Sequence, residues 1–309
     1  HTRHDRIVAY LKELDRLSDK VSFEIIGETF ERRAQVVAIF SSPENHKNIE
    51  QIRLQHLSNL TNGTNNKVPL VIHLAYNVHG NEPSSSEAAL LTAYYLTASQ
   101  SEQTKEWLNN MIITLDPVIN PDGRDRHTHW ANMHKGTPPV ADPNDREHNE
   151  IWPGGRFNHY WFDLNRDWIW LIHPESRGHI SVYQKWMPQV HVDYHEQGYH
   201  SNYFTVPGTT PRNLLLPAQY EALADTIGRA NIEEFDSADY YFNKTLDIKI
   251  EYGMNTGWLK SKIGKLSIAR GKPDVAIKIC EEGLEESYEM QNVRPQMFNC
   301  ECLNEAYSL

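Results

Sequence analysis

The chain has 309 residues, of which 39% are hydrophobic and 23% are charged, and its formal net charge is −11. This length suffices to bury a full α/β core, alone or with a small appended domain. The acidic balance argues against general nucleic-acid binding, which depends on a basic surface, and no apolar run reaches the roughly 18 residues of a membrane span.

The first 236 residues alternate between strand-like and helix-like segments. Apolar residues recur at helical spacing near the N-terminus, and runs rich in Val and Ile follow, bounded by turn residues. In chain order the pattern predicts a helix over 5–17, strands over 21–30 and 34–42, a buried strand over 67–76, a helix over 83–98, a strand over 111–119, a helix over 175–186, a strand over 188–194 and a helix over 220–235. Such alternation indicates an α/β sheet with helices on its faces.

The long segment over 124–160 shows no regular period. It follows a Pro-Asp-Gly turn and is rich in His, Asn, Pro and Gly. Irregular segments of this length inside a compact domain are usually functional or disordered. We expect its histidine-rich part, residues 127–148, to form the wall of a pocket, and we assign it no metal role.

Beyond about residue 237 the strand pattern stops and a helical pattern continues to the end. Two loosely self-similar stretches, over 240–271 and 276–309, repeat with a period of about 38–40 residues. Part of this tail resembles a tetratricopeptide repeat, in which small residues allow antiparallel helices to approach closely; here they are Gly264, Ala269, Gly271 and Ala276. We therefore predict two domains, 1–236 and 237–309, and a tail that can recruit a protein partner.

All three cysteines, Cys280, Cys300 and Cys302, lie in this tail. The main domain therefore has no disulfide framework. Cys300 and Cys302 form a CxC pair, and no second pair completes a tetrahedral metal site. We expect ordinary thiols at all three positions.

Two side chains of metal-ligand type, His79 and Glu82, lie in the loop between a buried strand and a helix. Glu82 precedes Pro83, which disfavours the α-region, so both side chains project from a tight loop and not from a helix face. Sites in open α/β sheets form just outside such strand ends. Zinc accepts imidazole and carboxylate ligands together, and its catalytic sites use three protein ligands. The alternative interpretation is a surface turn with two solvated side chains.

The strand segment HVDYHEQG offers a third ligand, either His191 or His195. The two histidines are four residues apart and share one face of the strand. His195 lies at the strand's end, whereas His191 lies about 13 Å further back at about 3.3 Å per residue. His195 is therefore the predicted ligand, and the alternative is an ordinary residue at a strand end.

The segment WFDLNRDW supplies Asn165 and Arg166. An arginine fork binds a carboxylate through two parallel hydrogen bonds, and asparagine adds a neutral donor. The pair suits a pocket for the C-terminal carboxylate of a peptide. The alternative is an Arg166 that pairs with Asp163 or Asp167.

Taken in order, HGNEP, NPDGRDR, DLNRDW and VDYHEQG resemble the zinc carboxypeptidase family over roughly residues 5–236. The resemblance implies an α/β fold with a mixed central sheet flanked by helices. It also implies one zinc ion held by His79, Glu82 and His195.

The same resemblance implies metal-assisted hydrolysis at the C-terminus of a peptide or protein. Zinc polarises the scissile carbonyl and activates water, and a carboxylate acts as general base. Asn165 and Arg166 are implied to hold the substrate carboxylate. An arginine that stabilises the oxyanion is expected after the NPDG turn, where Arg124 and Arg126 are the nearest choices.

The family's catalytic glutamate lies on a late strand, and in this chain the corresponding region is the helical tail. The implied sheet is therefore incomplete, and Glu251 is only a weak candidate for the base. Three functions stay open: a zinc metallocarboxypeptidase, an inactive zinc-retaining module that binds peptides and recruits a partner through its tail, and a zinc deacylase of small acylated amino acids.

The compartment is also an expectation from the resemblance. Relatives are commonly exported, which favours a secreted or periplasmic location. The chain opens HTRHDRIVAY without a signal segment, and a start at His1 in place of Met favours removal of an earlier N-terminus.

Overall fold

The computed structural model describes residues 1–197, 215–234 and 256–308, apart from residues 65, 138, 139, 141, 143, 218 and 290–292. The chain divides into two compact units, His1–Glu196 and Gln197–Leu309. The predicted boundary near residue 236 lies outside the described residues and stays a prediction. No described helix is long and apolar enough to cross a membrane.

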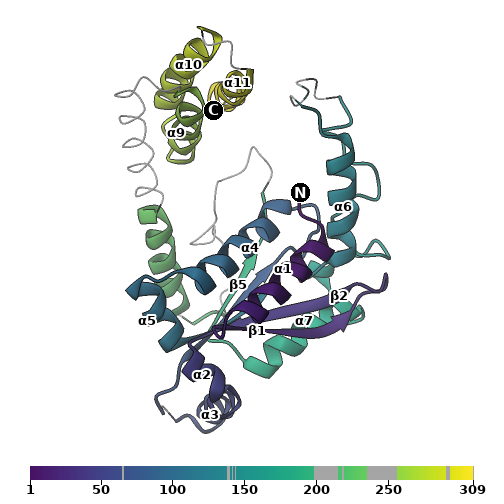
Figure 1. The fold of residues 1–309 in the computed structure, drawn as a ribbon, viewed down its shortest axis with the longest axis vertical. Coiled ribbons are helices and arrows are strands. Elements are labelled where there is room, and N and C mark those ends of the chain that lie inside the picture. The colour runs from purple at the N-terminus through teal and green to yellow at the C-terminus, as the bar shows by residue number, and fades with distance from the viewer. Residues whose placement is uncertain are drawn as a thin grey trace. The chain divides into compact units, whose positions relative to one another are not determined.

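A mixed five-stranded sheet forms the centre of the first unit, which confirms the predicted fold class (Figure 1). Its order is β1-β2-β4-β3-β5, with antiparallel pairing of β1 with β2 and of β2 with β4, and parallel pairing of β4 with β3 and of β3 with β5. The strands are β1 (Val21–Glu28), β2 (Ala34–Phe40), β3 (Leu70–Tyr76), β4 (Met111–Asp116) and β5 (Val190–Tyr194).

Helices cover both faces of this sheet. The helical elements of the unit are α1 (His4–Leu17), α2 (Pro43–Lys47), α3 (Ile49–Asn62), α4 (Pro83–Ala98), α5 (Glu102–Asn110), α6 (Pro121–His134), the 3₁₀ turn η1 (Leu164–Arg166) and α7 (Pro174–Trp186). Side chains alternate across β2, as the period of two demands. Its Val36, Ala38 and Phe40 pack in the core with α1 and α4, whereas Val37 and Ile39 pack in a second core with α3 and α7.

The segment after β4 corrects the sequence prediction, because part of the expected irregular loop over 124–160 is the helix α6. The Asn120 side chain accepts a hydrogen bond from the backbone N–H of Gly123, and Pro121 occupies the first helical position. These are the signals of a helix N-terminus. The Pro-Asp-Gly sequence also suits a turn, which explains the wrong prediction.

Three helices of the second unit pack against one another: α9 (Gly257–Ala269), α10 (Pro273–Glu289) and α11 (Val293–Tyr307). Residues 219–234 are helical as well. A Cβ atom built on Gly264 would collide with the sulfur atoms of Cys280 and Cys302, so Gly264 does lie at a close helix approach. Gly271 instead occupies a left-handed turn with φ +68°. The resemblance to tetratricopeptide repeats and the partner-recruiting role stay predictions.

The expectation of ordinary thiols is wrong for Cys280 and Cys302 and is confirmed for Cys300. Cys280 on α10 forms a disulfide with Cys302 on α11, and Cys300 is an exposed free thiol. The two bonded cysteines are 22 residues apart. Only the packing of the two helices brings them together, and no spacing rule indicates it.

Candidate metal centre

The centre lies where two neighbouring parallel strands end. In the pairing of β3 with β5, Tyr76 lies opposite Tyr194. The loop that carries His79 and Glu82 follows β3, and His195 follows β5 directly. Because parallel strands end at the same edge of a sheet, these two distant segments start side by side.

A buried asparagine shapes the loop after β3. Asn77 has a left-handed backbone with φ 60°, which asparagine tolerates better than most residues. Its side-chain nitrogen donates to the carbonyl oxygens of both His79 and Glu82, at 2.9 Å each. Asn77 was not singled out in the sequence, although it belongs to the same loop motif.

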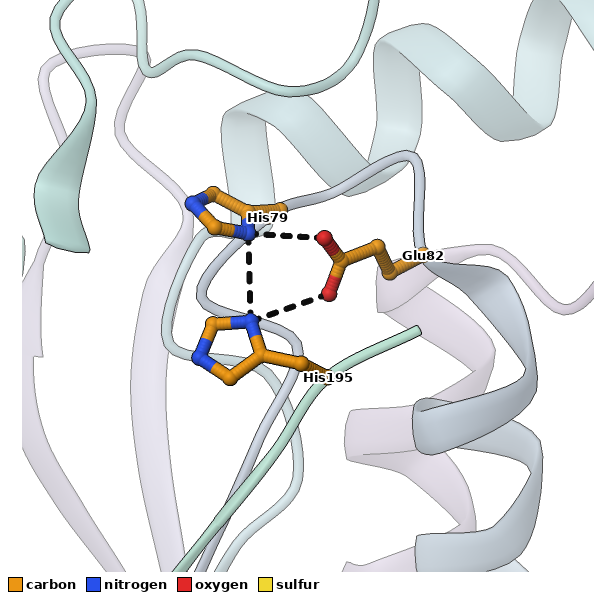
Figure 2. A group of neighbouring side chains, drawn as sticks. All are labelled: His79, Glu82 and His195. Carbon is orange, nitrogen blue, oxygen red and sulfur yellow. Dashed lines mark hydrogen bonds and ion pairs between the residues drawn. The ribbon is translucent and has the colours of Figure 1, made fainter. Parts of the chain in front are cut away.

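The three predicted ligands converge (Figure 2). The Nδ1 atom of His79 lies 2.8 Å from one carboxylate oxygen of Glu82, and the Nδ1 atom of His195 lies 3.1 Å from the other. The two Nδ1 atoms are 3.2 Å apart. Tetrahedral zinc with bonds of about 2.0–2.1 Å spaces its ligand atoms by roughly 3.3 Å. The donor set and its spacing therefore fit one zinc ion, and no other such group occurs among the described residues.

Carboxylates hold the outer nitrogens of both imidazoles. His79 Nε2 lies 2.9 Å from an oxygen of Asp163, and His195 Nε2 lies 2.9 Å from an oxygen of Asp193. Metal-binding histidines usually donate their second N–H to such an acceptor, which leaves the facing nitrogen free to bind the metal. In the sequence, Asp163 was a candidate partner of Arg166 only, and Asp193 was not singled out.

The electrostatics favour a positive charge between the three side chains. Burial raises the pKa of Glu82, but hydrogen bonds with His195 and His79 outweigh it, so the pKa falls to about 2. Hydrogen bonds with Asp193 and Glu82 raise the pKa of His195 to about 10. A divalent cation bound between these side chains would supply positive charge at the same position in place of a proton.

The predicted carboxylate-binding pair lies beside this centre on η1. The side-chain nitrogen of Asn165 is 3.4 Å from His195 Nε2. Arg166 is exposed, and its guanidinium donates to the Asn165 carbonyl oxygen at 3.0 Å. Asp163 instead pairs with Arg156 at 3.0 Å, and Asp167 accepts from the backbone of residues 172 and 173.

The arginines after the NPDG turn point elsewhere. Arg124 is fully buried and donates to Glu87 and to the carbonyl oxygens of residues 2 and 83. Arg126 donates to the carbonyl oxygens of residues 154, 157 and 158. The arginine at the centre is Arg156, with one guanidinium nitrogen 3.6 Å from Glu82. No sequence signal singled it out, because it is far from that turn along the chain.

His191 lies outside the centre, as its position along β5 predicts. Its ring packs against those of His73 and His179, with centroids 5.2 and 5.9 Å away.

Two further glutamates are of interest as possible acids or bases. The carboxylate of Glu196, next to His195, accepts a hydrogen bond from the backbone N–H of Ser84 at 2.5 Å. Glu251 lies outside the described residues.

Comparison with known proteins identifies one family. A model described as zinc carboxypeptidase matches residues 7–204. No curated protein matches significantly.

The chain is also similar to several solved structures. A metallo-carboxypeptidase from Burkholderia cenocepacia shares 14% identity and a TM-score of 0.43, over 63% of this chain and 41% of that one. The carboxypeptidase A from Helicoverpa armigera shares 17% identity and a TM-score of 0.48, over 76% of this chain and 54% of that one. This chain thus spans only about half the length of the solved structures it matches.

Proposed function

Because the chain belongs to the zinc carboxypeptidase family, we propose that it is a zinc-dependent metallocarboxypeptidase that hydrolyses the C-terminal bond of peptides or proteins. The observation that carries the proposal is the convergence of His79, Glu82 and His195 from two separate loops. These three residues would hold the ion. Zinc bound there supplies a Lewis acid for the scissile carbonyl and lowers the pKa of water.

The carboxylates that contact the Nε2 atoms of the two histidines would position the metal ligands. Asp163 and Asp193 fix the ring orientation of His79 and His195, which keeps both Nδ1 atoms facing Glu82. Arg156 lies next to Glu82 with 40% of its side chain exposed. We assign Arg156 the role of stabilising the negative charge that develops on the scissile carbonyl oxygen, because a fixed cationic donor at that position lowers the barrier to hydrolysis.

Asn165 and Arg166 would bind the substrate's C-terminal carboxylate. Both lie on η1, directly after the aspartate that contacts His79. A guanidinium fork and an amide next to the metal suit a carboxylate one residue beyond the scissile bond. Arg126, which was predicted to contact substrate, would act indirectly, because it holds the carbonyl oxygens on either side of Arg156.

A second candidate function is a zinc-retaining module that binds peptides without turnover. Asp163, Asp193 and Glu196 are the carboxylates described next to the three ligands, and each is engaged in a hydrogen bond. The sequence assigned none of these three carboxylates the role of general base. The weak candidate for the base of the first function is Glu251, which lies outside the described residues.

Zinc content and hydrolysis of a blocked dipeptide, measured together, test the proposal. We expect one equivalent of zinc and chelator-sensitive release of the C-terminal residue. His195→Ala should lose both, while the exposed His129→Ala should keep both. Zinc and peptide binding without hydrolysis would favour the binding module, and absence of zinc binding would refute both functions.

A further inference from the structure

Four large aromatic side chains, at positions 30, 152, 160 and 161, are exposed. Exposed fractions are 39% for Phe30, 70% for Trp152, 62% for Tyr160 and 55% for Trp161. They form two edge-to-face pairs, Trp152 with Trp161 at 4.5 Å between centroids and Phe30 with Tyr160 at 4.6 Å. We call these four residues the aromatic surface. Clustered apolar exposure of this kind marks a binding site more often than a neutral surface.

The segment that carries Tyr160 and Trp161 is held in shape. The fully buried Asn158 accepts hydrogen bonds at its side-chain oxygen from the backbone N–H groups of residues 160 and 162. Its backbone N–H donates to the carbonyl oxygen of residue 162, and its side-chain nitrogen lies 2.9 Å from His173 Nδ1. These hydrogen bonds fix the turn that carries the rings of Tyr160 and Trp161. A ligand that binds to these rings would therefore order little of the protein, and the entropic cost of binding would be small.

Two residues of the aromatic surface, Trp152 and Trp161, lie close along the chain to residues of the proposed substrate site. Only Phe162 separates Trp161 from Asp163, which contacts His79, so the backbones of residues 161 and 163 are at most about 7 Å apart. Trp152 lies four residues before Arg156, the arginine next to Glu82. Asn165 and Arg166 follow Asp163 in the other direction along the chain.

A hollow on this surface is lined by Glu31, Arg126, His159, Tyr160 and Trp161. Its charged groups already have protein partners. Arg126 donates to three backbone carbonyl oxygens, and Glu31 accepts from Arg33 and lies 3.0 Å from His159. A ligand in the hollow would therefore contact aromatic rings more than free hydrogen-bonding groups. An apolar side chain would bind there more favourably than a sugar, because the hydroxyl groups of a sugar need polar partners.

We propose that the aromatic surface binds apolar or aromatic side chains of the substrate peptide upstream of the scissile bond. The inference rests on the proposed function. A substrate held by its C-terminal carboxylate extends past the metal in one direction only, towards its N-terminus. The aromatic residues 152–161 precede Asp163 along the chain, whereas Asn165 and Arg166, which would hold that carboxylate, follow it. We therefore assign the aromatic surface to upstream residues of the substrate. Trp and Tyr are the residues that contribute most at such interfaces.

Two acetylated pentapeptides test the proposal in binding. Both end in Ala-Phe with a non-hydrolysable link before the last residue, and their first three residues are Leu-Phe-Leu or Ser-Asn-Ser. We expect the apolar peptide to bind the zinc-loaded full chain about tenfold more tightly, as for one well-buried aromatic contact. Trp152→Ser should abolish this preference, and Trp170→Ser, at a Trp with the same 70% exposure outside the aromatic surface, should keep it.

Thermal unfolding of each variant verifies folding, and Tyr160→Ser provides a second test should Trp152→Ser fail to fold. Equal affinities of the two peptides, or a preference that survives both substitutions, would overturn the proposal. So would displacement of the apolar peptide by a chito-oligosaccharide, which would assign the surface to sugar. Amidated peptides separate the two proposals: a preference that persists with no loss of affinity on amidation would support the aromatic surface and refute carboxylate capture.

Discussion

Glu175 provides a quantitative test of how the burial of a carboxyl group changes its pKa and thereby the free energy of unfolding. The residue is fully buried in the first turn of α7. A helix N-terminus favours a negative charge, yet burial, aided by the nearby charge of Asp122, raises the pKa of Glu175 from its ordinary value of 4.5 to about 7. Each pH unit between the folded and unfolded pKa values corresponds to 1.36 kcal/mol. The gap therefore corresponds to about 3 kcal/mol.

The direction of the effect follows from which state holds the proton. Below pH 4.5 the carboxyl is protonated in both states, and its burial adds no charge penalty. Between pH 4.5 and 7 the unfolded chain releases the proton while the folded chain retains it, so the free energy of unfolding falls as the pH rises. Above pH 7 the loss is complete at about 3 kcal/mol.

Glu175→Gln removes the titration and keeps the shape. We expect the variant to gain up to about 3 kcal/mol relative to wild type at pH 8, and the gain to disappear at pH 4.5. Urea unfolding at half-unit intervals of pH measures the difference directly, with the exposed Glu106→Gln as matched control. A difference that stays constant from pH 4.5 to 8 would refute the reasoning.

Three further changes test other parts of the structure. Asp163→Asn removes the charged acceptor behind His79 and should weaken zinc affinity by roughly 10–100-fold in a chelator competition; unchanged affinity would contradict the assigned positioning role. Arg156→Ala should lower kcat by about 10²–10³ while zinc content stays the same, and full activity would exclude Arg156 from oxyanion binding. Gly264→Ala should lower the free energy of unfolding of the helical unit by about 1–3 kcal/mol, since its methyl group would collide with the sulfur atoms of Cys280 and Cys302; a neutral result in thermal unfolding would show that α9 can shift.

The sequence by itself determined the features that depend on local order. The alternation along β2 and the apolar run of β3 are consequences of strand geometry, so they predicted the sheet and its buried strands. The loop with His79 and Glu82 was found because Pro83 prevents a helix from starting earlier. His195 was preferred over His191 by distance along the strand alone. The structure brings His195 next to His79 and Glu82, and its role as a metal ligand stays a prediction.

Packing between distant segments decided the rest. Arg156 reaches Glu82, Asp163 holds the imidazole of His79, and Cys280 meets Cys302 only because separate elements dock in three dimensions. None of these three contacts has a fixed spacing along the chain, whereas Asp193 lies only two residues before the His195 that it holds. Backbone periodicity is a local property that a sequence displays directly, whereas the partner of a side chain depends on the register and docking of whole strands and helices, which only the tertiary structure decides.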